Sequence, residues 1–167
     1  MASINGIQIK NLKKFKDHEG CEIAQGDVWY KGKKLGYWSQ DYMCGPDTYG
    51  FDESVLSGEV EKYAASDYVE EKFKKLCDLD ILLGNLVNIA EEEKTYKKGV
   101  KSGYKSYISA TDGFHVKGYY TMDTDIKKIE GKKFHKDFVD GCKKEFFKDW
   151  NGGCTIYTSL KDFDITV

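Results

Sequence analysis

The sequence contains no arginine, because all 26 of its basic residues are lysines. Arginine provides a planar, bidentate donor for carboxylates, phosphates and guanine edges, whereas lysine provides only a mobile point charge. Any site that needs a fixed cationic clamp therefore has to work without one. The same bias is also typical of the codon usage of an AT-rich genome, so it indicates no function by itself.

Proline and long apolar runs are scarce as well. The chain has one proline, Pro46, and no Pro/Gly/Ser-rich linker, internal repeat or low-complexity tract. Its longest apolar stretch, residues 81–90, is interrupted by glycine and asparagine and is too short to span a bilayer. The first residues lack the charged and apolar regions of a signal peptide. We therefore expect a single, soluble, cytoplasmic domain over residues 1–167.

Charge and cysteine usage exclude several specialised classes. The 28 acidic residues and 26 lysines give a net charge of −2, whereas a general nucleic-acid binder carries a strong basic excess. The five cysteines are widely spaced and form no CxxC pair, so we expect reduced, structural thiols. Glycine-rich phosphate loops are absent too. We expect a protein without a cofactor.

The first fifty residues predict β-structure. Ile7 and Ile9 alternate with polar residues, as in a half-buried strand, and residues 27–40 have the pattern of a hairpin. Strict alternation places Trp29 and Trp38 on the same face of this hairpin. The hairpin is then apolar on both sides. Either helices cover both faces, or one aromatic face is a binding surface.

The centre of the chain predicts helix. Apolar residues recur at three- and four-residue steps between residues 69 and 90, with Asp67 as a candidate N-cap and either Gly99 or Gly103 at the end. The pattern is interrupted around residues 78–80, so we expect either two helices or one kinked helix. We expect Phe73, Leu83 and Leu86 to be buried. Residues 133–150 predict a further amphipathic helix, and the remaining strands are predicted over residues 114–122, 154–157 and 163–167.

Strands first, helices in the middle and strands again indicate an α+β fold. The predicted architecture is an antiparallel sheet with an N-terminal hairpin, packed by two or three amphipathic helices.

The strongest candidate for a binding surface is the aromatic segment that ends the hairpin and follows it. Trp, Tyr and Met are enriched at protein interfaces and their hot spots. The predicted partner-binding residues are Trp38, Tyr42, Met43, Tyr49 and Phe51. We expect these side chains to be at least partly exposed, and the protein to bind a protein partner rather than to catalyse a reaction. If they form the core of a small sheet instead, the interface is lost.

A second candidate surface interleaves lysines with tyrosines over residues 94–107. Lysines for phosphate charge and rings for stacking are what single-strand nucleic-acid or nucleotide binding uses. The predicted residues are Tyr96, Lys97, Lys98, Lys101, Tyr104 and Lys105. The pattern also fits a solvated helix end whose lysines complement the helix dipole and whose tyrosines are half-buried. Nucleic-acid binding is therefore the alternative function.

The sequence gives little support to metal binding or catalysis. His18, Glu19 and Cys21 form one short group of candidate ligands, but zinc sites usually show paired ligands at defined spacings. A small hydrolase would be built on His18, Cys44 and Asp47, and nothing in their spacing brings them together. We expect no metal and no catalytic residue, and a hydrolase ranks last.

The first fifty residues carry a resemblance to a group of proteins. Residues 5–13 (NGIQIKNLK), 18–20 (HEG), 32–36 (GKKLG) and 45–47 (GPD) resemble small uncharacterised proteins of phages and mobile elements in low-GC Gram-positive bacteria. The resemblance implies a small accessory protein that blocks a host defence. It implies no catalytic or binding residue.

Overall fold

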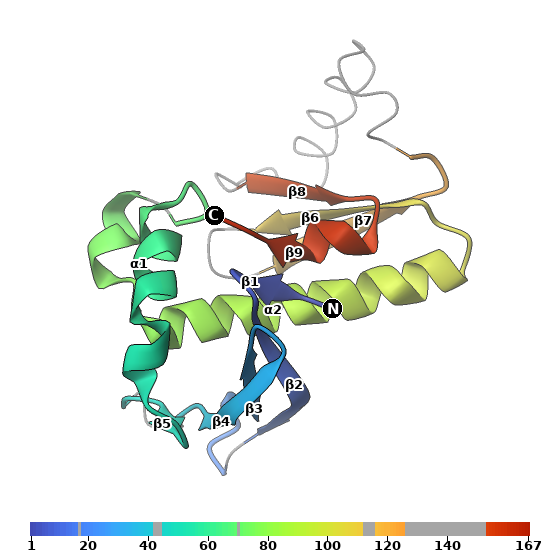
Figure 1. Cartoon of the computed structure of the whole chain (residues 1–167). Coiled ribbons are helices and arrows are strands. Elements are labelled where there is room, and N and C mark those ends of the chain that lie inside the picture. The colour runs from blue at the N-terminus through green and yellow to red at the C-terminus, as the bar shows by residue number, and fades with distance from the viewer. Residues whose placement is uncertain (17, 42–44, 70, 112–115, 126–152) are drawn as a thin grey trace. The chain divides into compact units, whose positions relative to one another are not determined.

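The structure is a computed structural model of the whole chain, and it describes all residues except 17, 42–44, 70, 112–115 and 126–152 (Figure 1). The chain divides into two compact units, one formed by Met1–Glu91 with Phe163–Val167 and the other by Glu92–Asp162. Each unit contains a sheet and helical residues. The fold class is α+β, as the sequence predicts.

The described residues of the first unit form a six-stranded sheet in the order β5-β4-β3-β2-β1-β9. The strands are β1 (Ser3–Ile4), β2 (Ile7–Lys16), β3 (Glu22–Tyr30), β4 (Lys33–Ser39), β5 (Thr48–Tyr49) and β9 (Asp164–Ile165). All neighbours pair antiparallel except β1 and β9, which are parallel. The Asn5 side chain accepts a hydrogen bond from Val167 N at 2.9 Å, which ties the two chain ends to one edge of the sheet.

The predicted hairpin is formed by β3 and β4. Its turn is the pair Lys31 and Gly32, with φ values of +47° and +82°. Positive φ at both central positions is typical of the type I′ turn, whose twist matches that of the flanking strands. Ile7 and Ile9 of β2 are buried, which confirms the predicted half-buried strand.

A β-bulge interrupts the pairing of β3 with β4. Val28 pairs with Gly36, but the next residue, Trp29, pairs with Lys34. Leu35 is therefore an extra residue on β4. One extra residue reverses the alternation of side chains beyond it, so every residue of β4 after Leu35 changes face relative to β3.

The bulge contradicts the prediction that Trp29 and Trp38 share a face. Trp38 pairs with Gly26 and lies on the face that carries Val28, here called the inner face, where it is fully buried. Trp29 lies on the opposite, outer face together with Tyr37. The prediction was wrong because strict alternation cannot anticipate an inserted residue.

The helical residues of the first unit are η1 (Glu53–Leu56), α1 (Ser57–Ala65), η2 (Glu71–Leu76) and the start of α2 (Leu79–Lys101). Asp78, not Asp67, caps α2, because its carboxylate accepts a hydrogen bond from Ile81 N at 3.0 Å. The sequence patterns assigned no element to α1. Gly103, with φ of +93°, follows the last turn of α2, as one of the two predicted endings requires.

The core of the first unit is aliphatic. Leu83 and Leu86 of α2 are fully buried, as predicted. Phe73 is only half-buried, and Lys72 Nζ lies 4.7 Å from the centre of its ring. The prediction for Phe73 was wrong because it belongs to η2, which is separate from α2 and does not continue its apolar face.

The second unit contains the three-stranded antiparallel sheet β7-β6-β8. Its elements are the rest of α2, β6 (Ser106–Thr111), β7 (Val116–Met122), β8 (Gly153–Tyr157) and most of η4 (Leu160–Phe163). Glu92 of α2 is buried and accepts hydrogen bonds from the hydroxyls of Ser109 and Tyr157, so it fastens α2 to β6 and β8. The helix predicted over residues 133–150 lies outside the described residues.

Two strands of the second unit were predicted, over residues 114–122 and 154–157, and both are found. The last predicted strand, over residues 163–167, is shorter: η4 ends at Phe163, and only Asp164–Ile165 form β9. No helix in the described part of the chain is long and apolar enough to cross a membrane.

We expect Leu86→Ala to lower the free energy of unfolding by about 2–5 kcal/mol, because truncation of a fully buried leucine removes apolar contacts and leaves a cavity. Urea denaturation measures the change. Leu76→Ala is the matched control, because Leu76 is 65% exposed and its truncation should change stability by less than about 0.5 kcal/mol. Equal midpoints for Leu86→Ala and the wild type would contradict the placement of Leu86 in the core.

Candidate binding surface

The outer face of β2, β3 and β4 is the part of the first unit that presents aromatic and polar side chains together. In an antiparallel sheet, directly paired residues point to the same face. The pairs on the outer face include Lys13 with Gln25, Phe15 with Ile23, and Asp27 with Tyr37. Phe15 is 42% exposed and Tyr37 is 53% exposed. Large rings on a solvent-facing sheet surface are candidates for contact with a partner.

The inner face of the same strands is occupied by the protein itself. Ala24, Val28 and Trp38 are all buried. Lys14, which pairs with Ala24, forms an ion pair with Glu91 of α2 at 3.0 Å. The inner face therefore belongs to the core of the first unit, whereas the outer face carries exposed side chains.

A second bulge lies on β2. Lys10 pairs with Asp27, but Lys13 pairs with Gln25, so Asn11 and Leu12 both stand opposite Gly26. Asn11 has a φ of +54°, a left-handed conformation that asparagine tolerates better than most residues. A Cβ at position 26 would lie 2.6 Å from Ile9 Cγ2, so the bulged strand can approach β3 only over a glycine.

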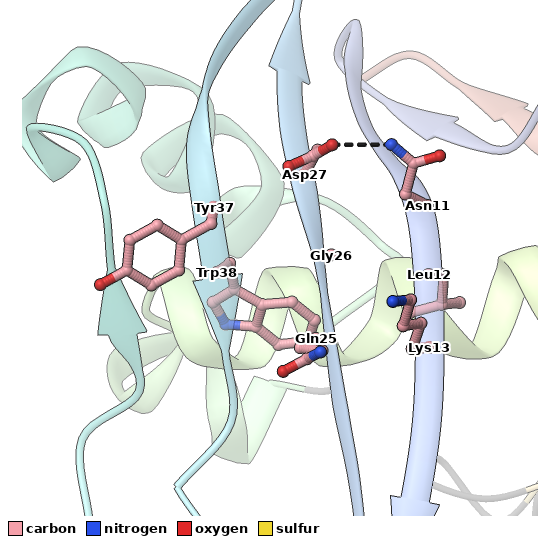
Figure 2. Close-up of a pocket in the computed structure, with 8 residues that line it drawn as sticks. All are labelled: Asn11, Leu12, Lys13, Gln25, Gly26, Asp27, Tyr37 and Trp38. Atoms are coloured by element: carbon pink, nitrogen blue, oxygen red, sulfur yellow. Dashed lines mark hydrogen bonds between the residues drawn. The ribbon is translucent and has the colours of Figure 1, made fainter.

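A hollow of about 650 Å³ lies beside the β2 bulge (Figure 2). It is lined by Asn11, Leu12, Lys13, Gln25, Gly26, Asp27, Tyr37 and Trp38. Four of these residues belong to the outer face. Bulges are common next to functional sites because they redirect side chains, and here they create a concave surface on an otherwise regular sheet.

Asp27 connects the three strands that surround the hollow. Its carboxylate accepts a hydrogen bond from Asn11 Nδ2 at 2.7 Å and forms an ion pair with Lys34 Nζ at 2.7 Å. The hydrogen bond from Lys34, followed by that from Asn11, holds the pKa of Asp27 below its usual value. Asn11 lies in the β2 bulge and Lys34 directly precedes the bulge residue Leu35. Asp27, Asn11 and Lys34 therefore hold both bulges against β3. This set of contacts is called the Asp27 clip.

Three polar groups at the hollow make no hydrogen bond or ion pair with the described residues: the Lys13 ammonium, the Gln25 side-chain amide and the Tyr37 hydroxyl. By contrast, Lys14 is paired with Glu22 and Glu91. Figure 2 shows Tyr37 pointing away from Asn11 and Leu12, so its ring and the Lys13–Gln25 pair occupy different parts of the surface.

Within the aromatic segment, Trp38 does not have the exposure that the sequence predicts. Trp38 has no exposed surface, and its Nε1 donates a hydrogen bond to Asp47 Oδ2 at 2.7 Å. The prediction of exposure for Trp38 is wrong, because the Leu35 bulge turns this side chain into the core. Tyr42 and Met43 lie outside the described residues.

Tyr49 and Phe51 are half-buried and support the segment after β4. Their rings meet edge to face at 5.5 Å, and the Tyr49 hydroxyl donates to the Asp80 carboxylate at the start of α2. Burial raises the pKa of Tyr49, and it also raises the pKa of Asp47. These contacts show that both rings help to hold the segment against α2, although each keeps some exposed surface.

The lysine–tyrosine patch lies in the second unit. Tyr96 and Tyr107 are 6% and 2% exposed, so neither ring can stack on a base as the sequence suggested. Tyr104 is 41% exposed, and Lys98, Lys101 and Lys105 are exposed. A further member of the patch, Lys97, forms an ion pair with Glu93 at 2.8 Å. The patch retains its lysines but only one of its three rings.

The residues considered for metal binding or hydrolysis do not form a site. His18 is exposed in the turn between β2 and β3, 3.8 Å from Glu19 Oε1, and Cys21 is exposed beside it. Asp47 is engaged by Trp38, and Cys44 lies outside the described residues. Within the described part of the chain, no three His, Cys, Asp or Glu side chains are grouped so that they could hold a metal ion.

Comparison with family models, with curated proteins and with solved structures gives no match for this sequence. Function therefore has to be argued from the side chains themselves.

The sequence patterns missed Phe15, Tyr37, Lys13 and Gln25. One local signal was present, since Phe15 stands between Lys14 and Lys16, where an apolar side chain in a strand of lysines is an exception. Tyr37 gave no such signal, because its face depends on the bulge.

We expect Lys34→Met to raise the pKa of Asp27 toward its ordinary value of 3.8, because the largest stabilisation of the carboxylate is removed. A lowered pKa contributes stability that is complete above about pH 4 and is lost as the pH falls through the folded-state value, so the variant should lose this contribution. An NMR titration of the carboxyl carbon measures the pKa. Lys33→Met, which removes an exposed lysine outside this ion pair, should leave it unchanged. An unchanged pKa of Asp27 in the Lys34→Met variant would contradict the ion pair between Lys34 and Asp27.

Proposed function

We propose that this chain is a non-catalytic binding protein that docks a protein partner on the outer face of β2, β3 and β4. The observation that carries the proposal is the exposure of Phe15 and Tyr37 on the same sheet face as a hollow whose lining includes polar groups without a partner among the described residues. Aromatic residues are enriched at protein interfaces and their hot spots.

The rigidity of the surface supports protein binding. Both rings stand on paired strands, and the Asp27 clip fixes the strands that carry the bulges. A surface that is already ordered loses little conformational entropy when a partner docks. Tyrosine is suited to such a surface, since its large ring has few rotatable bonds and a polar tip.

The charge of the outer face indicates the kind of partner. Lys10, Lys13 and Lys34 lie on this face with a single acidic residue, Asp27. Lys10 Nζ lies 3.8 Å from the centre of the Trp29 ring, and Lys34 is paired with Asp27. Lys13 alone of the three has no such contact among the described residues. A partner with an acidic patch would complement this face.

The proposed biological setting is that of an accessory protein of a phage or mobile element that blocks a host-defence protein by occupying its surface. Its support is the resemblance carried by the first fifty residues, which include β2, β3 and β4. The arginine-free, lysine-rich composition is compatible with such a source.

Nucleic-acid binding by the second unit is the alternative function. Residues 94–105 contain five lysines and no acidic residue, and Tyr104 leaves a ring exposed between them. We rank it second because Tyr96 and Tyr107 are buried. In addition, Lys98 and Lys101 lie in the last turn of α2, where they complement the helix dipole without any ligand.

We expect Tyr37→Ala to weaken partner binding by about 2 kcal/mol or more, or roughly 30-fold in Kd, as loss of an interface hot spot does. The measurement is quantitative capture from lysate of a low-GC Gram-positive bacterium, followed by titration of the captured protein. Tyr68→Ala is the matched control, because Tyr68 is 59% exposed in the first unit but is not on β2, β3 or β4. Unchanged thermal stability in both variants verifies that the fold is intact.

The same measurement also tests the nucleic-acid alternative. We expect normal binding of the captured protein by a triple variant with Lys98→Met, Lys101→Met and Lys105→Met. If this variant abolishes binding in a strongly salt-dependent manner while Tyr37→Ala has no effect, the outer face is not the docking surface and the nucleic-acid function is favoured.

A further inference from the structure

We infer that the hollow is a carboxylate site, in which an aspartate or glutamate side chain of the partner lies between the Lys13 ammonium and the Gln25 amide. The inference rests on the proposed function, because it names the chemical group that the outer face selects. It follows from the register of the strands, from the pairing of the neighbouring charges and from the shape of the hollow.

The register brings the two donors to one place. Lys13 on β2 and Gln25 on β3 are direct partners, so their Cβ atoms lie about 4.5–5.5 Å apart on the same face. In Figure 2 the Lys13 ammonium and the Gln25 amide nitrogen are each directed toward the other's strand. A carboxylate can accept hydrogen bonds from two donors at once, one at each oxygen. The Lys13 ammonium and the Gln25 amide can therefore both donate to the same carboxylate.

Lys13 is the cation lining the hollow that has no acidic partner among the described residues. Lys14 is committed to Glu22 and Glu91, and Lys34 is committed to Asp27. Asp27 itself is neutralised by Lys34 and receives the Asn11 amide, so it opposes an incoming anion only weakly. A single unpaired ammonium beside a neutral amide donor favours one carboxylate, whereas a nucleic-acid backbone requires several cations along its path.

The lining of the hollow includes apolar surface. Leu12 and Gly26 both line it, and Leu12 contributes an apolar side chain. The methylene groups of a glutamate can lie on this surface while its carboxylate reaches the two donors. Because lysine lacks the bidentate geometry of arginine, the amide of Gln25 supplies the second donor that fixes orientation.

The test is an NMR titration of the ¹⁵N-labelled full chain with N-acetylglutamate N-methylamide. We expect saturable shifts at the backbone amides of Lys13, Gln25 and Gly26, and no saturable shift with the neutral probe N-acetylglutamine N-methylamide. Lys13→Met should abolish the response and Lys13→Arg should retain it. Lys33→Met, an exposed lysine outside the hollow, should bind like the wild type.

Three outcomes overturn the inference: equal responses to the charged and neutral probes, an unchanged response in Lys13→Met, or tighter binding of dimethyl phosphate at the same amides. The last would make the hollow a phosphate site. The proposed function fails separately. If the titration fails while Tyr37→Ala still weakens capture of the partner, the outer face remains the docking surface and only the carboxylate site is wrong.

Discussion

One extra residue, Leu35, determines which side chains of the hairpin the protein keeps and which it presents. If Leu35 instead paired with Val28 in regular alternation, β4 would carry Trp38 on the face of Trp29 and Tyr37 on the face of Val28. With the bulge, the indole of Trp38 enters the core and bonds to Asp47, and the ring of Tyr37 emerges on the outer face. A bulge of this kind leaves local hydrogen-bonding groups unpaired and needs support. Here Asp27 supplies it by joining Lys34 to Asn11, the residue that forms the second bulge.

The two faces of the first sheet therefore differ in their burial. The inner face packs against α2 and supplies apolar burial, the dominant favourable term in folding. The outer face contributes little to the core, which leaves Phe15, Tyr37 and Lys13 available for a partner. Side chains that stabilise a fold and those that bind a partner are usually in competition for the same positions. In this sheet the Leu35 bulge buries Trp38 on the inner face and leaves Tyr37 exposed on the outer face.

The α+β class and much of the core could be predicted because they depend on local periodicity. Ile7, Ile9 and Leu86 follow patterns that a few neighbouring residues define. The candidate surface could not be predicted, because the contacts that shape it are not local. Asp27 meets a residue 16 positions before it, and a one-residue bulge leaves no mark in composition. The burial of Tyr96 and Tyr107 was missed for a similar reason, because Tyr96 lies on α2 and Tyr107 on β6, and the spacing of tyrosines along the chain does not show that the fold buries them.

The central claim is that the Leu35 bulge sets the register of β3 against β4, and cross-strand nuclear Overhauser effects between backbone protons test it most directly. The account predicts a shifted register, with contacts that join Gly26 to Trp38 and Asp27 to Tyr37 beyond the bulge, and Trp29 to Lys34 before it. A continuous, unbulged register would instead join Gln25 to Trp38 and Asp27 to Gly36. That result would return Tyr37 to the inner face and contradict both the docking surface and the hollow built upon it.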